Sequence, residues 1–267
     1  MQPENQFGQR PVESAATGSA VTKPPAALPA GLSRVAEPAA TPQFARARSF
    51  GRPTSHALAL AAALGMLVAL LAAALYLPGA PLARLDLALA ASLGHQVDAS
   101  LIAAMAMLTR LGDSVVIAAL SGAACLVLLL RGRLAQAVFV LLLVATGYLF
   151  NSTLKLLVHR PRPVLLADLA PPTTYSFPSG HAFGTTALVV SLFLVWIGSR
   201  QRSGLARAVA GCIAALWVVL MGASRVLVGA HYLSDVIAGT LLAVAWAALW
   251  SGCLACPRQS GRALPEQ

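Results

Sequence analysis

Long apolar runs dominate the chain from residue 57 onward and determine the expected architecture. An α-helix needs about 20 mostly apolar residues to cross a bilayer. Six runs approach that length: residues 57–77, 114–130, 134–154, 182–198, 206–223 and 232–250. The pattern predicts an all-α integral membrane protein with a six-helix bundle in residues 55–252.

The segment 80–112, between the first two runs, has a different pattern. Its Leu and Ala residues recur at helical spacing, but charged and polar residues interrupt them: Arg84, Asp86, His95, Asp98 and Arg110. A helix with one polar and one apolar face is typical of the membrane interface. We therefore expect one interfacial amphipathic helix here, or a pair of them, rather than a seventh span.

The two ends of the chain lack apolar periodicity. Residues 1–54 are rich in Pro, Ala, Ser, Gln and Gly and contain six Lys or Arg and three Glu. Such a composition buries too little apolar surface to fold, so this segment is expected to be a disordered basic tail. Residues 253–267 are expected to form a second, short tail.

Composition supports a membrane protein and argues against nucleic-acid binding. Of the 267 residues, 58% are hydrophobic and 10% are charged, with mean hydropathy +0.74. The net charge is +10. Nucleic-acid binders gather their cations into a stripe or patch, whereas here Lys and Arg lie between apolar runs.

The distribution of Lys and Arg predicts the orientation. In a six-span topology, 13 of these residues lie on the side of the two termini and six on the other side. The excess of positive charge belongs in the cytoplasm. Both termini are therefore expected to be cytoplasmic, and the Ala/Leu/Arg-rich composition favours the inner membrane of a bacterium.

Four cysteines, Cys125, Cys212, Cys253 and Cys256, lie within or at the edge of apolar runs. Their placement predicts no disulfide framework. The Cys253-x-x-Cys256 spacing is shared with zinc sites, but no second Cys or His pair lies near it. The sequence therefore predicts neither a bound metal nor another cofactor.

Three short strings contain most of the polar residues at the ends of the later runs. They are Lys155 with Arg162-Pro163, then Pro178-Ser179-Gly180-His181, then Ser224-Arg225 followed by His231 and Asp235. The six-span topology puts all three strings at the outer ends of the last four spans. Ionisable residues at membrane depth face a cavity or a partner, so the strings predict one site on the outer face.

The cations and the helix entrance in these strings suit phosphate. Lys155, Arg162 and Arg225 can bind its oxygens, although each alone could equally be a headgroup anchor. Ser179 precedes an apolar helical run as an N-cap, and Gly180 allows close approach of the backbone. The N-terminus of that helix is a ready anion site.

The two histidines suit opposite chemical roles. His231 and Asp235 are four residues apart at the start of the last run, which predicts one helical face. A carboxylate holds one imidazole nitrogen as N–H and leaves the other free to attack phosphorus. His181 is then the acid that protonates the leaving oxygen, and the two roles predict a bell-shaped pH profile.

Other polar residues have simpler interpretations. His56, His95 and His159 are expected at the interface, with a substrate contact by His159 or Arg160 left open. Asp113 follows Leu111-Gly112. It either caps the second run or faces the site.

The three strings match without substitution the signature of a known family. They resemble the type-2 phosphatidic acid phosphatase and vanadium haloperoxidase superfamily, in its membrane lipid phosphatase branch. The resemblance implies a phosphohistidine on His231, an acid at His181 and an orienting Asp235. It also implies phosphate binding by Lys155, Arg162, Ser179, Gly180 and Arg225, without a metal.

The expected function is hydrolysis of a lipid phosphomonoester or pyrophosphate. Undecaprenyl pyrophosphate, phosphatidic acid and phosphatidylglycerol phosphate are the candidate substrates, and no nucleic acid is involved. Two alternatives remain open: a lipid phosphotransferase using the same residues, and a non-catalytic protein that binds or transports lipids.

Overall fold

The computed structural model describes residues 55–163, 174–199 and 202–254, and within these ranges every regular element is a helix. The helices are α1 (Ser55–Ala74), α2 (Pro81–Gln96), α3 (Ala99–Thr109), η2 (Arg110–Gly112), α4 (Ser114–Leu130), α5 (Leu134–Val158), α6 (Gly180–Ser199), α7 (Gly204–Leu227) and α8 (Leu233–Leu254). The expected tail 1–54 and nearly all of the expected tail 253–267 lie outside the described residues.

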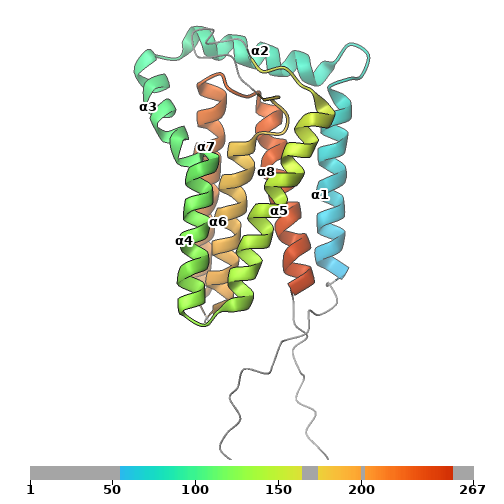
Figure 1. Cartoon of the computed structure of the whole chain (residues 1–267). Coiled ribbons are helices and arrows are strands. Elements are labelled where there is room, and N and C mark those ends of the chain that lie inside the picture. Colours follow the sequence, from blue (N-terminus) through green and yellow to red (C-terminus); the bar gives the residue numbers. More distant parts are fainter. Residues whose placement is uncertain (1–54, 164–173, 200–201, 255–267) are drawn as a thin grey trace, which may run out of the picture. The chain divides into compact units, whose positions relative to one another are not determined.

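The described helices form the expected membrane bundle. Five of them, α1, α5, α6, α7 and α8, are long and apolar enough to span a bilayer. The sixth span is a bent pair in which α3 and η2 meet α4 at 45°. Figure 1 shows the spans side by side, with α2 lying across one end of the bundle. The all-α, six-span prediction is confirmed.

The segment between the first two spans is only partly as expected. α2 includes the charged Arg84 and Asp86 and lies at the end of the bundle, where an interfacial helix was predicted. α3, in contrast, has no charged residue among its 11 positions. It packs against α7 and forms the outer part of the bent span. A mostly apolar helix without charges gains more from burial in the bundle and lipid than from lying at the interface.

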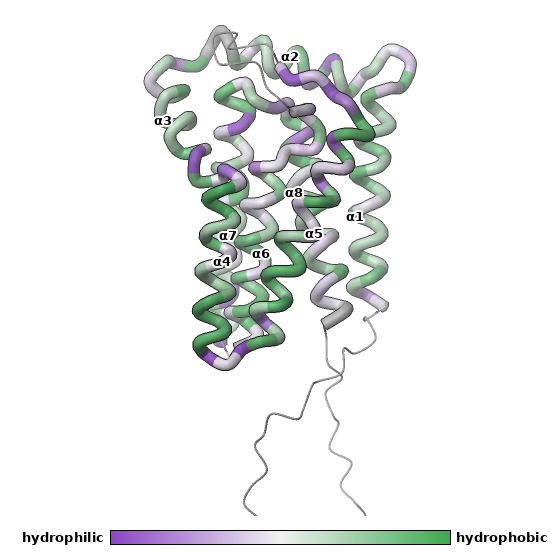
Figure 2. Tube along the Cα trace, viewed as in Figure 1, coloured by the Kyte–Doolittle hydropathy of each residue, from purple (hydrophilic) through white to green (hydrophobic). Residues whose placement is uncertain are grey.

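Hydropathy along the chain distinguishes the spans from the turns that join them. The spans are mostly apolar, and the polar positions concentrate in the turns at the two ends of the bundle (Figure 2). Large apolar side chains face outward from the spans: Val115 is 80% exposed and Leu216 is 67% exposed. Surfaces of this kind are compatible with lipid rather than water.

Close packing of α6 against α8 brings two of the sequence strings together. A Cβ atom on Gly239 of α8 would lie 2.5 Å from the carbonyl oxygen of Ser179, at the start of α6. Glycine is therefore needed where the helices cross. The Ser179 amide donates a hydrogen bond to the Asp235 carbonyl at 3.0 Å, which ties the two helix starts directly.

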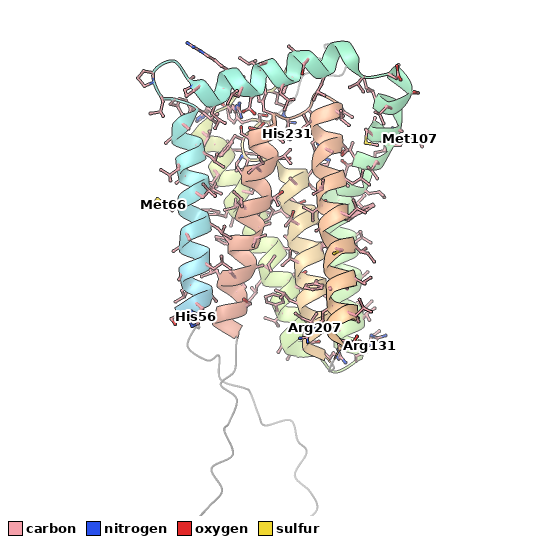
Figure 3. All side chains as sticks on the ribbon, turned by 180° about the vertical axis from the view of Figure 1, so that it is seen from behind. His56, Met66, Met107, Arg131, Arg207 and His231 are labelled. Carbon is pink, nitrogen blue, oxygen red and sulfur yellow. The ribbon has the colours of Figure 1, made fainter. Side chains whose placement is uncertain are left out.

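The two ends of the bundle differ in charge and in polar content. His56, Arg131 and Arg207 lie at one end, and His231 lies at the other, beneath α2 (Figure 3). The turn that joins α4 to α5 belongs to the first end, and Gly132 there has φ +67°, a left-handed conformation suited to glycine. The end with His231 contains the candidate site.

Candidate active site

The predicted site residues gather at the end of the bundle that α2 crosses. They come from the last turn of α5 and the segment after it, the start of α6, the last turn of α7 and the start of α8: Lys155, Arg162, Ser179, Gly180, His181, Arg225, His231 and Asp235. Antiparallel neighbours alternate in direction, so the ends of odd spans and the starts of even spans meet. The alternating direction of the spans therefore brings the three strings to the same end of the bundle.

His231 lies in the short connection between α7 and α8 and is 2% exposed. Its backbone amide donates to the Arg225 carbonyl at 3.2 Å. The prediction placed His231 and Asp235 on one helix, but α8 begins at Leu233, so His231 is a loop residue and only Asp235 is helical. Because His231 lies in this loop, its imidazole can face the segment that follows α5.

The imidazole of His231 contacts a different partner through each nitrogen. Its Nδ1 lies 3.2 Å from the Ser176 hydroxyl and 3.5 Å from Asp235 Oδ2. Its Nε2 lies 3.3 Å from Arg162 Nη1. Because 3.5 Å is too long for a good hydrogen bond, the carboxylate acts on this ring mainly through Ser176, whose hydroxyl donates to Asp235 Oδ2 at 2.5 Å.

Asp235 is fully buried and satisfied on both oxygens. Oδ2 accepts from the Tyr232 amide at 2.9 Å as well as from Ser176. Oδ1 accepts from Arg160 Nη1 at 2.5 Å. A buried carboxylate with this many donors is stable as the anion. The orienting group of the site is therefore a fixed negative charge.

Arg160 connects this carboxylate to α2. It is 7% exposed, and its Nη2 donates to Asp86 Oδ2 at 2.7 Å. Its guanidinium lies 4.1 Å from the centre of the Tyr232 ring. The Asp86 carboxylate also accepts from the amide and hydroxyl of Ser234. A helix expected at the interface thus supplies a buried charge to the site.

The three cations meet around His231 and the start of α6. Arg162 is anchored by Thr174, whose carbonyl and hydroxyl accept from Nε and Nη2 at 2.9 and 2.8 Å. Lys155 Nζ donates to the Tyr175 carbonyl at 2.9 Å. Arg225 Nη1 donates to the Thr109 hydroxyl at 2.7 Å, while its Nε is buried without a hydrogen-bond partner among the described residues.

The start of α6 faces these cations. The Ser179 hydroxyl accepts from the Ala182 amide at 3.4 Å, so Ser179 caps the helix as expected. A Cβ atom on Gly180 would lie 3.9 Å from Lys155 Cε. The free amides of a helix start thus lie beside a lysine, an arrangement that can bind an anion.

His181 has its own carboxylate. Its Nε2 lies 2.8 Å from Asp113 Oδ1, and the two side chains are 20% and 51% exposed. Of the two interpretations of Asp113, the structure excludes the helix cap, because its side chain makes no cap hydrogen bond to α4. Asp113 faces the site.

Burial and neighbouring charge lower the pKa values of His231 and Arg162, two groups outside the spans. Desolvation, with the positive charges of Arg162 and Arg225, lowers the pKa of His231 to about 3, although Asp235 acts in the opposite direction. Desolvation also lowers the pKa of the Arg162 guanidinium. His231 is thus a neutral base at ordinary pH, with a lone pair available on one nitrogen.

Sequence reasoning missed or undervalued several members of this network. Ser176 and Asp86 were not predicted, and Arg160 was considered only as a substrate contact. His159, left open in the same way, ends α5 in a left-handed conformation and packs edge-on to Tyr175.

Within the described ranges no three His, Cys, Asp or Glu side chains are grouped as a metal site would require. The side chains of His95 and Cys253, and the whole of Cys256, lie outside what the structure describes.

Comparison with known proteins agrees with this geometry. Residues 136–255, which hold all three strings, match the model of the PAP2 superfamily. This part of the chain, slightly less than half of it, is similar to the PAP2 superfamily. One curated relative is phosphatidylglycerophosphatase B of Bacillus subtilis, 35% identical in an alignment of 105 residues that covers 37% of this chain and 48% of the relative. The match thus spans about half the length of that relative.

Two solved structures align with this chain. A transmembrane PAP2-type phosphatidylglycerolphosphate phosphatase from Bacillus subtilis aligns with TM-score 0.64 and 26% identity, over 72% of this chain and 94% of that one. Aquifex aeolicus LpxE aligns with TM-score 0.48 and 22% identity, over 62% of this chain and 94% of that one. The first alignment supports the predicted membrane PAP2 fold.

Proposed function

We propose that the protein is a membrane lipid phosphatase that hydrolyses its substrate through a phosphohistidine on His231. The observation that carries this proposal is the state of the His231 ring. Its Nδ1 is tied to Asp235 through Ser176, and its Nε2 lies 3.3 Å from the Arg162 guanidinium. A phosphate bound by Arg162 would sit against a neutral nitrogen that is ready to attack.

The surrounding groups fit a phosphoryl binding site. Lys155, Arg162 and Arg225 lie close enough to interact electrostatically. Gathering like charges without an anion between them is unfavourable, and a phosphate would relieve the repulsion. Amides at Gly180 and beyond add neutral donors, and the buried Nε of Arg225 is a further donor still without a partner.

The reaction proceeds in two balanced steps. In the first, His231 Nε2 forms a bond to phosphorus while the P–O bond to the lipid alcohol breaks, and His181 gives its proton to the departing oxygen. In the second, a water molecule gives a proton to His181 and its oxygen bonds to phosphorus. The P–N bond then breaks, inorganic phosphate leaves, and both histidines return to their starting states.

A lipid phosphate is the substrate class that suits the location. The site lies at one end of an apolar bundle, the level at which a lipid headgroup would meet it while the acyl chains stay in the membrane. Both Bacillus subtilis relatives are named for phosphatidylglycerol phosphate, which makes this lipid the first substrate to test. Phosphatidic acid and undecaprenyl pyrophosphate are the next.

The proposed location is the bacterial inner membrane, with both termini in the cytoplasm and the site on the outer face. Arg131 and Arg207 lie at the end opposite His231 (Figure 3). The 13-to-six distribution of Lys and Arg assigns that opposite end to the cytoplasm.

The test is phosphate release by purified protein in detergent, with chelator and without added metal. We expect release from at least one of the three lipids and an acid-labile phosphoenzyme after rapid quenching. His231→Ala should abolish both, lowering kcat by at least about 10⁴-fold because the nucleophile is absent.

His56→Ala is the matched control, since this exposed histidine lies at the opposite end of the bundle (Figure 3). It should retain activity. Phosphate release by His231→Ala at the wild-type rate would refute the mechanism. Phosphate appearing only when an acceptor lipid is present, and then bound to that lipid, would identify a phosphotransferase instead.

A further inference from the structure

The bend in the second span occurs at a residue whose side chain points into the site. α3 and η2 meet α4 at 45°, and Asp113 is the residue at the junction. A residue in this position usually caps the following helix with its side chain. Asp113 makes no such hydrogen bond, and its Oδ1 lies 2.8 Å from His181 Nε2.

We infer that Asp113 is a positioning residue that fixes the tautomer of His181 and makes Nδ1 the nitrogen that exchanges protons with substrate. The inference rests on the proposed function, because it assigns a partner to the proposed acid. It gives the site two histidine–carboxylate pairs with different tasks. Asp235 serves the nucleophile, and Asp113 serves the acid.

Hydrogen-bond chemistry determines which nitrogen is available. An ionised carboxylate only accepts hydrogen bonds, so the Nε2 atom facing Asp113 must be N–H. Nδ1 is then the nitrogen that gains or loses a proton. No hydrogen bond to His181 Nδ1 is present among the described residues. The two histidines thus expose opposite nitrogens, Nδ1 in His181 and Nε2 in His231.

Charge explains why the acid needs this partner. Arg225 from α7 and Arg162 from the segment after α5 both act on His181, and Lys155 lies beyond Gly180. The two arginines repel a protonated imidazole. Among the groups that act on His181, Asp113 is the one of opposite charge. Removing it leaves the proton on His181 opposed by cations, and only a bound phosphate would compensate.

Packing around the junction is consistent with a fixed contact. A Cβ atom on Gly112 would lie 3.1 Å from His181 Cδ2 and 2.8 Å from the Met221 sulfur. The residue before Asp113 must therefore be small for the chain to run this close to the imidazole. The bend, the glycine and the carboxylate together bring the second span to His181.

The experiment compares two leaving groups in wild-type protein and Asp113→Asn, over a range of pH. An alkyl phosphomonoester such as phosphatidic acid needs a proton on its leaving oxygen, whereas 4-nitrophenyl phosphate does not. We expect Asp113→Asn to lower kcat for the alkyl ester by about 10- to 100-fold, and to change kcat for the aryl ester little. The basic limb of the alkyl profile should move to lower pH.

Asp98→Asn is the matched control, because Asp98 precedes α3 as Asp113 precedes α4, is exposed and likewise makes no cap hydrogen bond. It should behave as wild type. An equal loss on both esters in Asp113→Asn would mean structural damage and overturn the inference. So would an unchanged alkyl rate and pH profile.

A second measurement does not depend on activity. In protein labelled with ¹⁵N-histidine, His181 should be the Nε2–H tautomer, with its signals assigned from His181→Asn. Asp113→Asn should lose this preference, because an amide can donate as well as accept. A His181 found as the Nδ1–H tautomer in wild type refutes the inference. Protein inactive on every ester, but with the expected tautomer, contradicts the proposed function alone.

Discussion

The two histidine–carboxylate pairs of the site are built in opposite ways. His231 and Asp235 have side chains 1% and 0% exposed, and the carboxylate accepts from Arg160, Ser176 and a backbone amide. His181 and Asp113 are 20% and 51% exposed and are joined by one contact. A nucleophile must hold one geometry, while an acid must gain and lose a proton in every cycle. Burial suits the first requirement and access to water suits the second.

The buried pair also depends on distant parts of the chain. Arg160 bonds Asp235 with one nitrogen and Asp86 of α2 with the other. The exposed pair involves only the junction before α4 and the start of α6. Substitutions in the buried pair should therefore lower both the stability of the fold and the rate of phosphate release. Substitutions in the exposed pair should lower only the rate.

The largest expected effect comes from Arg160→Met. This variant leaves Asp86 and Asp235 as buried carboxylates without their shared cation, and removing one partner of a buried ion pair costs about 3–5 kcal/mol. We expect a clear fall in the thermal unfolding midpoint in detergent and near-complete loss of phosphate release.

Arg84→Met is the control, since this exposed arginine lies on the same α2 helix. It should leave both the unfolding midpoint and the rate unchanged. Adding Asp86→Asn to Arg160→Met should recover part of the stability, because one of the two unpaired charges is gone. An unchanged unfolding midpoint in Arg160→Met would show that the pair contributes nothing to stability.

A smaller effect is expected from Ser176→Ala. The hydroxyl bridges His231 Nδ1 and Asp235 Oδ2, and without it the direct 3.5 Å separation is too long to hold the tautomer. We expect kcat to fall about 10- to 100-fold on alkyl and aryl esters alike, because the nucleophile acts on both. Steady-state assays on the two esters measure this.

Ser191→Ala controls for the loss of a buried hydroxyl, because Ser191 is 0% exposed and its hydroxyl donates to a helix carbonyl. Its kcat should be near that of wild type. If Ser176→Ala lowered only the alkyl rate, the serine would be serving the acid and the comparison between the two pairs would need revision.

The smallest effect concerns pH. Burial and nearby arginines lower the pKa of His231 to about 3, whereas an unfolded histidine takes up a proton near pH 6.5. Between these values the unfolded state binds more protons, so the contribution of His231 to stability falls as pH drops from about 6.5 toward 3. ¹⁵N NMR should show His231 neutral at pH 5, with His231→Asn used for assignment. A ring that protonates near pH 6.5 would contradict the burial argument.

This pKa also refines the bell-shaped profile expected from the sequence. In the free protein we expect His231 to stay unprotonated throughout pH 5 to 8 and so to add no acid limb there. Any change of rate with pH between pH 5 and 8 is therefore due to the titration of the acid, His181, or of the substrate phosphate.

The spans were predictable because bilayer thickness imposes a length on every apolar run. The three strings were predictable as a group because alternating spans bring their ends to one side. Contacts between segments far apart in the sequence were not predictable. Asp86 and Arg160 are 74 residues apart, and Asp113 and His181 are 68 apart. Periodicity says nothing about which polar side chains meet after packing.

Ser176 shows the same limit for a residue outside the helices. It lies two residues before Pro178, in a segment without helical or strand periodicity, and its bridging position depends on where α8 places Asp235. The 45° bend before α4 was likewise hidden, because both halves of the bent span are apolar. Local pattern therefore predicted the elements, and the packing of helices decided the roles of the polar residues between them.

The link from Asp86 through Arg160 to Asp235 has a consequence for biosynthesis. Asp86 and Arg160 are translated well before Ser234 and Asp235, which begin the last helix. During membrane insertion the earlier pair lacks half of its partners, and the contacts of Asp235 with Arg160 and Ser176 form only when α8 is present. A chain that stops short of its final span therefore lacks Asp235, the carboxylate that orients the nucleophile, and leaves Arg160 only partly neutralised.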